Sequence, residues 1–206
     1  MDYVVKHIPV DKFRRPGTKI IPQYITIHST ANLHSSALSE RNWLINPNNK
    51  VKASWHIAVD EKMCVEAIPL DEKTIHTNNK NGNITSISIE ICESGNRVKT
   101  LQNAVKLIVR LLKERNWGVN RLKRHYDWSG KICPRIFAEN DWAEWKTFKI
   151  AVEKELNISK VKVNIKGKIY NLDGFLKDGV NYVPIRAVAE ALGYKVGWQD
   201  GTVIIE

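Results

Sequence analysis

Thr85-Ser86-Ile87-Ser88-Ile89-Glu90-Ile91-Cys92 is the clearest β-strand in this chain of 206 residues. Isoleucine alternates with serine and glutamate, so one face of the strand is apolar and the other carries hydroxyls and a carboxylate. A carboxylate in such a strand is unusual. Glu90 has two interpretations, a solvent-facing position on a half-exposed sheet or a carboxylate kept for chemistry.

Further strands are predicted before this stretch. Residues 20–30 predict a strand that carries His28 near its C-terminal end, on the less apolar face. Residues 55–60 and 63–69 predict a pair of strands around a turn at residues 60–62. The chain therefore contains enough strands for a central sheet.

Helices are predicted between and after these strands. Residues 35–44 predict a short helix, and residues 101–115 predict an amphipathic helix with Thr100 as its N-cap. Asp141 and Glu144 have the spacing of a capping box and predict the start of a helix with aromatic core residues. Strands and helices together favour an α/β fold.

The sequence changes character near residue 158, which predicts two domains at residues 1–157 and 160–206. Residues 161–165 and 168–172 predict a hairpin, and Pro184 predicts the start of a short helix. A second hairpin is predicted around Gln199-Asp200-Gly201. This small α+β unit contains neither histidine nor cysteine, so we expect no catalytic residue there.

Composition and charge narrow the function classes. The chain is 43% hydrophobic and 26% charged, as in globular proteins, and no apolar run approaches the length of a membrane span. The N-terminus lacks the pattern of a secretory signal, so we expect a cytoplasmic protein until something releases it. The net charge of +10 favours a polyanionic partner, whether nucleic acid, anionic lipid or an anionic cell wall. The basic residues are scattered, which argues against a nucleic-acid-binding arm.

The cysteines and histidines suggest a metal site. Three cysteines do not form a disulfide framework, and Cys64 and Cys92 lie in apolar segments as expected for buried thiols. Seven residues separate His125 from Cys133, and His28 supplies a third candidate ligand. Two imidazoles and one thiolate would leave the fourth tetrahedral position of zinc open, as in a hydrolytic centre. The spacing alone is weak evidence, because a single histidine is more often structural.

Four segments carry a resemblance that covers about residues 20–156. They are Ile25-Thr26-Ile27-His28-Ser29-Thr30, Ala53-Ser54-Trp55-His56-Ile57-Ala58-Val59-Asp60, Ser86-Ile87-Ser88-Ile89-Glu90-Ile91-Cys92, and His125-Tyr126-Asp127 with Lys131 and Cys133-Pro134. In this order they resemble the zinc-dependent N-acetylmuramoyl-L-alanine amidases. That family includes phage and prophage endolysins and shares its fold with peptidoglycan recognition proteins. The resemblance implies an α/β domain with a mixed central sheet flanked by helices.

The resemblance also implies roles for eight residues. By position, the zinc ligands would be His28, His125 and Cys133. Glu90 would handle the attacking water, and Lys131 would support the developing oxyanion. Substrate contacts are expected from the remaining three, Trp55, His56 and His76. Some relatives have tyrosine at the position of Trp55, so packing in the pocket wall is expected of the indole. His56 is expected to be structural or substrate-lining, and His76 falls where relatives often carry a cleft histidine.

The last segment resembles a different module. Asn181-Tyr182-Val183-Pro184-Ile185-Arg186 and the residues up to Gly193 are similar to the N-terminal domain of copper amine oxidases, which is repeated in clostridial surface proteins. No copper site is expected without His or Cys. The implied roles are cell-wall binding or self-association, and the alternative is an inert appendage.

The sequence therefore predicts a peptidoglycan hydrolase, an endolysin of a phage or prophage. It would cleave the amide between N-acetylmuramic acid and L-alanine in bacterial peptidoglycan, of a Gram-positive, clostridial-like wall. The alternative is a non-catalytic peptidoglycan-binding protein on the same scaffold, whose usual mark is loss of the cysteine ligand; Cys133 is present here. A zinc peptidase that cuts elsewhere in the stem stays open. A nucleic-acid-binding protein is suggested only by the pI of 9.5.

Overall fold

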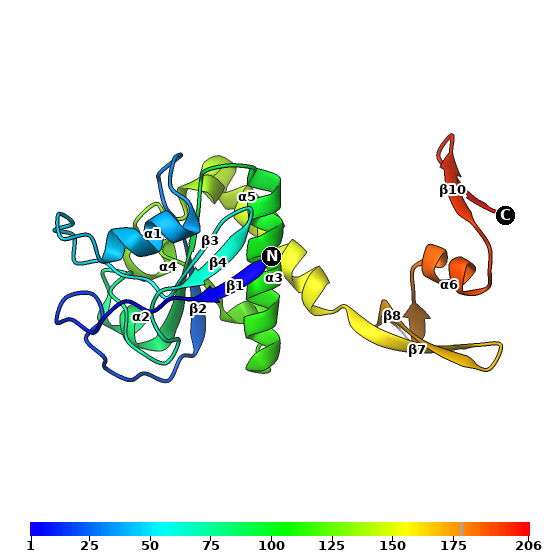
Figure 1. Cartoon of the computed structure of the whole chain (residues 1–206), viewed down its shortest axis with the longest axis horizontal. Helices are drawn as coiled ribbons and strands as arrows, with labels where there is room; N and C mark the ends of the chain where they lie inside the picture. Colours follow the sequence, from blue (N-terminus) through cyan, green and yellow to red (C-terminus); the bar gives the residue numbers. More distant parts are fainter. Residues whose placement is uncertain (178) are drawn as a thin grey trace. The chain divides into compact units, whose positions relative to one another are not determined.

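The computed structural model describes residues 1–177 and 179–206. These residues divide into two compact units, Met1–Glu155 and Leu156–Glu206 (Figure 1). Each unit contains both strands and helical segments and is described by itself.

A six-stranded sheet forms the centre of the first unit. Its strands lie in the order β1-β4-β3-β5-β2-β6. All neighbouring pairs are parallel except β3 and β4, which are antiparallel. The predicted mixed sheet is therefore confirmed. The strands are β1 (Asp2–Val5), β2 (Tyr24–Ser29), β3 (Ile57–Val59), β4 (Met63–Glu66), β5 (Ser86–Ile91) and β6 (Leu122–Arg124).

Helices flank this sheet on both sides (Figure 1). The short helix α1 packs against β3 and β4, and the long helix α3 contacts β3 and β5. The helices are α1 (Ala37–Leu44), α2 (Lys80–Thr85), α3 (Arg97–Glu114), α4 (Tyr126–Ser129) and α5 (Glu139–Leu156). Short 3-10 helices lie at Val119–Arg121 and Arg135–Phe137.

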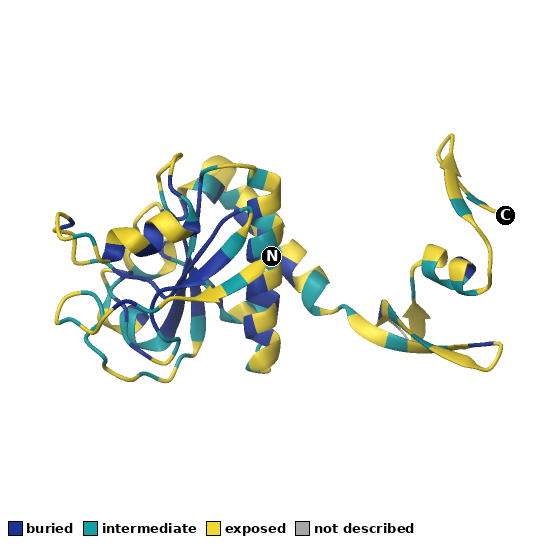
Figure 2. Cartoon of the chain, in the orientation of Figure 1, coloured by how far each residue is buried: buried dark blue, intermediate teal, exposed yellow. Residues whose placement is uncertain are grey.

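The core lies on the apolar faces that the sequence predicted. The central strands are coloured as buried in Figure 2. Ile87, Ile89 and Ile91 of β5 are completely buried, and so are Ile25 and Ile27 of β2. Burial of one such side chain contributes about 1.5–3 kcal/mol to stability. Cys64 and Cys92 are also fully buried free thiols, as predicted.

The start of α3 differs from the predicted one. The Asn96 side chain accepts a hydrogen bond from Lys99 N at 3.0 Å and caps the helix, so α3 begins at Arg97. The prediction of Thr100 as N-cap was wrong, and Thr100 is instead buried inside the helix. An asparagine side chain caps a helix as well as a threonine does, and this cap lies nearer to the preceding strand.

The start of α5 also differs. Within Glu139–Leu156 the backbone of Asn140, Asp141 and Trp142 is left-handed, with φ of 49°, 53° and 62°, so the regular right-handed helix follows Trp142. Asp141 therefore lacks the extended backbone of a cap. Trp145, Phe148 and Val152 are buried, as expected of the aromatic face of this helix. Trp142 differs from them, because the Arg124 guanidinium lies 4.2 Å from the centre of its ring.

The second unit consists of two antiparallel sheets and one helix. Strands β7 (Ser159–Ile165), β8 (Lys168–Lys177) and β9 (Val180–Tyr182) form one sheet, and β10 (Val196–Gln199) pairs with β11 (Thr202–Ile205). Helix α6 (Ile185–Ala191) lies between them in sequence. The predicted hairpin around Gln199-Asp200-Gly201 is present, with Gln199 as the last residue of β10. Asp200 and Gly201 form its turn, and both have the positive φ of a two-residue hairpin turn.

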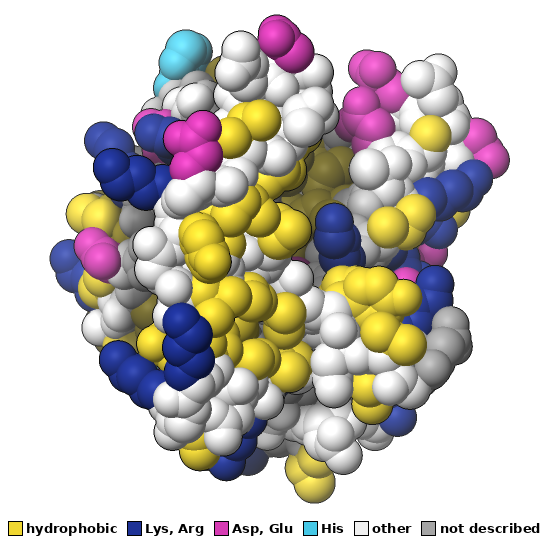
Figure 3. Space-filling model, turned by 90° about the vertical axis from the view of Figure 1, so that its right-hand side faces the viewer, with side chains coloured by type: hydrophobic (Ala, Val, Ile, Leu, Met, Phe, Trp, Pro, Cys, Tyr) yellow, Lys and Arg dark blue, Asp and Glu magenta, His cyan; other side chains and the backbone are white. Residues whose placement is uncertain are grey.

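Many apolar side chains of this second unit stay at the surface. Trp198 is 69% exposed, Leu176 66% and Ile185 57%. Figure 3 shows hydrophobic side chains at the molecular surface, interspersed with Lys and Arg. Among the described residues, no helix has the length and apolarity needed to cross a membrane.

Candidate metal centre

Three neighbouring parallel strands bring His28, Glu90 and His125 to one end of the sheet. His28 of β2 lies opposite Glu90 of β5 in the parallel register. His125 directly follows β6, and its backbone N donates to Ile27 O at 3.2 Å. The carboxyl ends of parallel strands meet at one edge, where α/β folds commonly place their sites.

The loop after β6 carries Cys133 back to the same place. Tyr126 N donates to Cys133 O at 3.0 Å, and Arg135 N donates to Ser29 Oγ at 3.1 Å. The Arg135 guanidinium also donates to the buried Glu93 carboxylate, with Nη2 and Oε2 2.7 Å apart. These contacts fix both sides of the cysteine against the end of β2.

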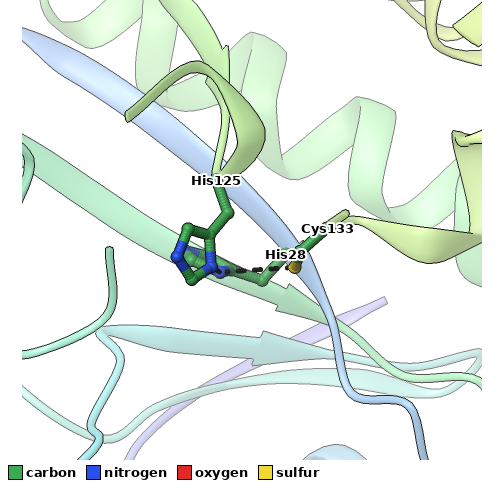
Figure 4. A group of neighbouring side chains, drawn as sticks. All are labelled: His28, His125 and Cys133. Atoms are coloured by element: carbon green, nitrogen blue, oxygen red, sulfur yellow. Dashed lines mark hydrogen bonds between the residues drawn. The ribbon is translucent and has the colours of Figure 1, made fainter. Parts of the chain in front are cut away.

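The three predicted ligands converge on a common point (Figure 4). His125 Nδ1 lies 3.1 Å from His28 Nδ1, and Cys133 Sγ lies 3.6 Å from the same nitrogen. All three ligand atoms lie within 4.8 Å of one another, and all three residues are buried. Tetrahedral zinc with its usual bond lengths needs ligand separations of about 3.3 Å between two nitrogens and about 3.6 Å between nitrogen and sulfur. The donor set and its geometry therefore fit zinc.

Burial controls the protonation of these ligands. It lowers the pKa of His28 well below its ordinary value and that of His125 to about 4, and nearby charge adds to both shifts. Burial and the neighbouring Glu90 raise the pKa of the Cys133 thiol to about 12. Without a metal at neutral pH, the imidazoles are neutral and the thiol keeps its proton.

Glu90 lies beside the ligands and Lys131 lies in their loop. Glu90 Oε1 is 4.0 Å from His28 Nδ1, and the Glu90 side chain is 14% exposed. Burial, with a smaller contribution from Glu40, raises the pKa of Glu90 to about 8 despite the opposing charge of Lys131. Glu90 is therefore not the solvent-facing residue of the simpler interpretation.

A pocket of about 700 Å³ opens over this cluster. Its lining includes the three ligands together with Glu90, Lys131, Trp55 and His76. Glu90 Oε2 and Trp55 Nε1 are buried, and neither atom has a hydrogen-bond partner within the described chain. Buried polar atoms without partners at a pocket wall are suited to bind a ligand or water there.

The structure does not bring His56 into this pocket lining. His56 is completely buried, and both of its ring nitrogens have partners inside the protein. Nδ1 lies 2.9 Å from Ser88 Oγ, and Nε2 lies 2.7 Å from Glu72 O. This placement favours the structural role of His56 over a substrate contact.

Two acidic residues at the site were missed from the sequence. Glu40 lines the pocket from α1, and Glu93 holds Arg135 beside the cysteine. Glu40 follows Ala37 by three residues and precedes Leu44 by four, so helical spacing alone places it on the buried face. Glu93 follows the end of β5 and has no comparable sequence signal.

Comparison with known proteins agrees with this geometry. A family model described as N-acetylmuramoyl-L-alanine amidase matches residues 16–136, more than half of the chain. The chain belongs to this amidase family. The four segments that carried the sequence resemblance all lie within this match.

The amidase match extends to individual relatives. The N-acetylmuramoyl-L-alanine amidase CwlA of Bacillus subtilis is 43% identical over 150 residues, which cover 69% of this chain and 53% of CwlA. XlyB of the same organism is 42% identical over 143 residues, 66% of this chain and 43% of XlyB. The chain therefore spans about half the length of these relatives. The structure of the catalytic domain of XlyA matches with a TM-score of 0.67 and 36% identity, covering 74% of this chain and 99% of that domain.

The C-terminal segment of this amidase-family chain matches a second family model. Residues 141–206 are similar to the copper amine oxidase N-terminal domain, as the sequence predicted. The match begins within α5 and covers the whole second unit.

Proposed function

We propose that this chain is a zinc-dependent N-acetylmuramoyl-L-alanine amidase that hydrolyses the amide between N-acetylmuramic acid and L-alanine in peptidoglycan. The observation that carries the proposal is the convergence of His28, His125 and Cys133 beside Glu90 in one pocket. Membership of the amidase family supports the reaction. A ligand set with its cysteine favours an enzyme over a binding protein on the same scaffold.

In this proposal each pocket residue has a chemical role. Zinc bound by the three ligands would polarise the amide carbonyl and activate water at neutral pH. Glu90, which the bound cation would keep ionised, accepts the proton of the attacking water and returns it to the departing amine. The Lys131 ammonium, in the loop that lines the pocket, stabilises the negative charge that develops on the carbonyl oxygen.

The pocket walls would hold the sugar and peptide on either side of the amide. Trp55 offers its indole Nε1 as an unused donor, and His76 lies in the same wall. A basic protein with a net charge of +10 suits a wall rich in anionic polymers, so we propose a Gram-positive wall as the target. The 37% identity to the solved structure of a mutant endolysin from Bacillus subtilis supports a lytic, phage- or prophage-type role.

Digestion of purified Gram-positive cell wall tests this function. The protein should release new N-terminal alanine, and mass analysis should find glycan strands without peptides. A chelator should abolish the release, and added zinc should restore it. Lys131→Ala should retain bound zinc and release alanine about 10²–10³-fold more slowly. New N-termini other than alanine would instead indicate a peptidase that cuts elsewhere in the stem.

We also propose that residues 160–206 form a separate domain for cell-wall binding or self-association, attached to a catalytic domain at residues 1–157. The exposed Trp198, Leu176 and Ile185 of this small unit support an apolar partner, and a second copy of the unit is the partner proposed. Light scattering of the full chain and of Trp198→Ser tests self-association. A dimer that the substitution weakens supports it, and two monomers with unchanged wall binding contradict it.

A further inference from the structure

A chain of hydrogen bonds runs behind the pocket, away from the ligands. The Trp128 indole Nε1 lies 2.9 Å from Thr26 Oγ1, and Thr26 Oγ1 lies 2.9 Å from Ser86 Oγ. Ser86 Oγ lies 2.7 Å from Gly82 O. An indole N–H can only donate and a carbonyl can only accept. Every proton in this chain therefore points in one direction, from Trp128 through Thr26 and Ser86 to Gly82.

This direction decides the tautomer of His76. Because the Ser86 proton is used on Gly82 O, Ser86 Oγ can only accept from His76 Nε2, which lies 3.4 Å away. A neutral imidazole has one N–H, so His76 carries it on Nε2 and leaves Nδ1 as an acceptor. Ser86 is completely buried and His76 is 8% exposed, so water does not offer a ready alternative partner.

The tautomer of His76 in turn decides that of His28. His76 Nδ1 lies 2.9 Å from His28 Nε2, so His28 donates from Nε2. Its only remaining lone pair is then on Nδ1, the atom that faces His125 Nδ1 at 3.1 Å and Cys133 Sγ at 3.6 Å. The opposite tautomer would point a proton at the place where the metal binds.

We propose that His76 is a positioning residue, which presents the His28 Nδ1 lone pair to the metal through a hydrogen-bond chain anchored by Ser86, Thr26 and Trp128. The inference rests on the metal-binding role proposed above for His28. It gives His76 a role in metal binding that acts through another residue and requires no contact with substrate. Outer partners of this kind typically contribute 10–100-fold to metal affinity.

The backbone around His76 is arranged to hold this contact. The Asn83 side-chain oxygen accepts from His76 N at 2.9 Å and from Thr77 N at 3.0 Å. Gly82 allows α2 to approach the Trp128 ring closely, because a Cβ at this position would lie 2.9 Å from Trp128 Cδ2. Asn83 and Gly82 therefore hold the His76 ring in place, whereas Ser86 determines which ring nitrogen carries the proton.

The test compares two serine substitutions on the same strand. Ser86 and Ser88 are both fully buried in β5, and Ser88 bonds to His56, which lies outside the pocket lining. Zinc affinity is measured by chelator competition at fixed pH. Ser86→Ala should weaken zinc binding about tenfold or more, whereas Ser88→Ala should leave it within about twofold. Equal zinc affinities in the two variants would overturn the proposal.

Substitution of His76 and a direct measurement complete the test. His76→Ala should weaken zinc binding 10–100-fold. His76→Asn should recover part of that loss, because the asparagine oxygen can replace the Nδ1 acceptor. Nitrogen-15 NMR of the unsubstituted, metal-free protein should show both His28 and His76 protonated on Nε2. A proton on His28 Nδ1 would overturn the inference while leaving zinc binding intact. An unsubstituted protein that binds no zinc would instead refute the proposed function.

Discussion

Zinc uptake at pH 6 should release two protons from this protein. One comes from the Cys133 thiol, whose pKa is raised to about 12 by burial and by Glu90. The other comes from Glu90, whose pKa is raised to about 8 mainly by burial, so that the carboxyl is about 99% protonated at pH 6. His28 Nδ1 lies 4.0 Å from Glu90 Oε1, so a divalent cation bound to this nitrogen should ionise the Glu90 carboxyl. His28 and His125 contribute no protons, because their depressed pKa values leave them neutral.

The sign of the pH dependence follows from this count. The metal-bound protein holds fewer protons than the metal-free protein, so zinc affinity rises with pH. Two protons correspond to a 100-fold change per pH unit, about 2.7 kcal/mol. Above about pH 8 Glu90 is already ionised and the dependence should fall to tenfold per unit. Zinc lowers the pKa of its bound water to about 7, so at pH 6 this water keeps its proton and does not add to the count.

Calorimetry in buffers of different ionisation enthalpy counts the protons directly. Glu90→Gln removes one titrating group and should lower the release from two protons to one at pH 6. The control Cys92→Ala removes a buried thiol outside the ligand cluster and should leave it at two. A release of one proton from both the unsubstituted protein and Glu90→Gln would refute the reasoning. That result would mean that Glu90 is already ionised in the metal-free protein, or that its protonation does not change when zinc binds.

Three further substitutions test the core, the packing near the pocket and the proposed chemistry. Ile89→Ala removes a fully buried side chain from β5 and should lower the free energy of unfolding by about 2–5 kcal/mol in urea denaturation. Gly82→Ala would place a Cβ 2.6 Å from Thr77 Oγ1 and 2.9 Å from Trp128, and should cost about 1–3 kcal/mol in the same assay. Glu90→Gln should slow alanine release from cell wall about 10²–10⁴-fold with zinc still bound, and an unchanged rate would exclude Glu90 as the proton carrier.

The strands that sequence alone could predict are those with internal patterns. The alternation in β5 is complete, and β2 alternates well enough to place His28 on the less apolar face near its C-terminal end. By contrast β6 is Leu122–Arg124, a single apolar residue and two cations, and it becomes a strand because it pairs with β2. Helix α2 contains an Asn-Gly-Asn run that favours turns, and its cap at Asn79 holds it in place.

The candidate zinc ligands could be predicted from the sequence by their residue types. The residues that contact these ligands could be identified only from the folded structure. Two histidines and a cysteine suggested zinc, but His56 and His76 look alike in the sequence. The pairing of the strands decides between them. It points His56 toward Ser88 inside the sheet and lets His76 reach His28. The acidic residue Glu93 became recognisable only through its contact with Arg135.

The proposed ligands come from distant parts of the chain: His125 follows His28 by 97 positions, and Cys133 follows it by 105. During synthesis, β6 pairs with β2 only late. Before this pairing the growing chain contains His28, whereas His125 and Cys133, which follow β6, have not yet been made. Synthesis can therefore proceed almost to the end of the first unit before the proposed metal centre is complete. On the proposed function, a truncated product that lacks this edge strand would hold one of the three ligands and could not hydrolyse peptidoglycan.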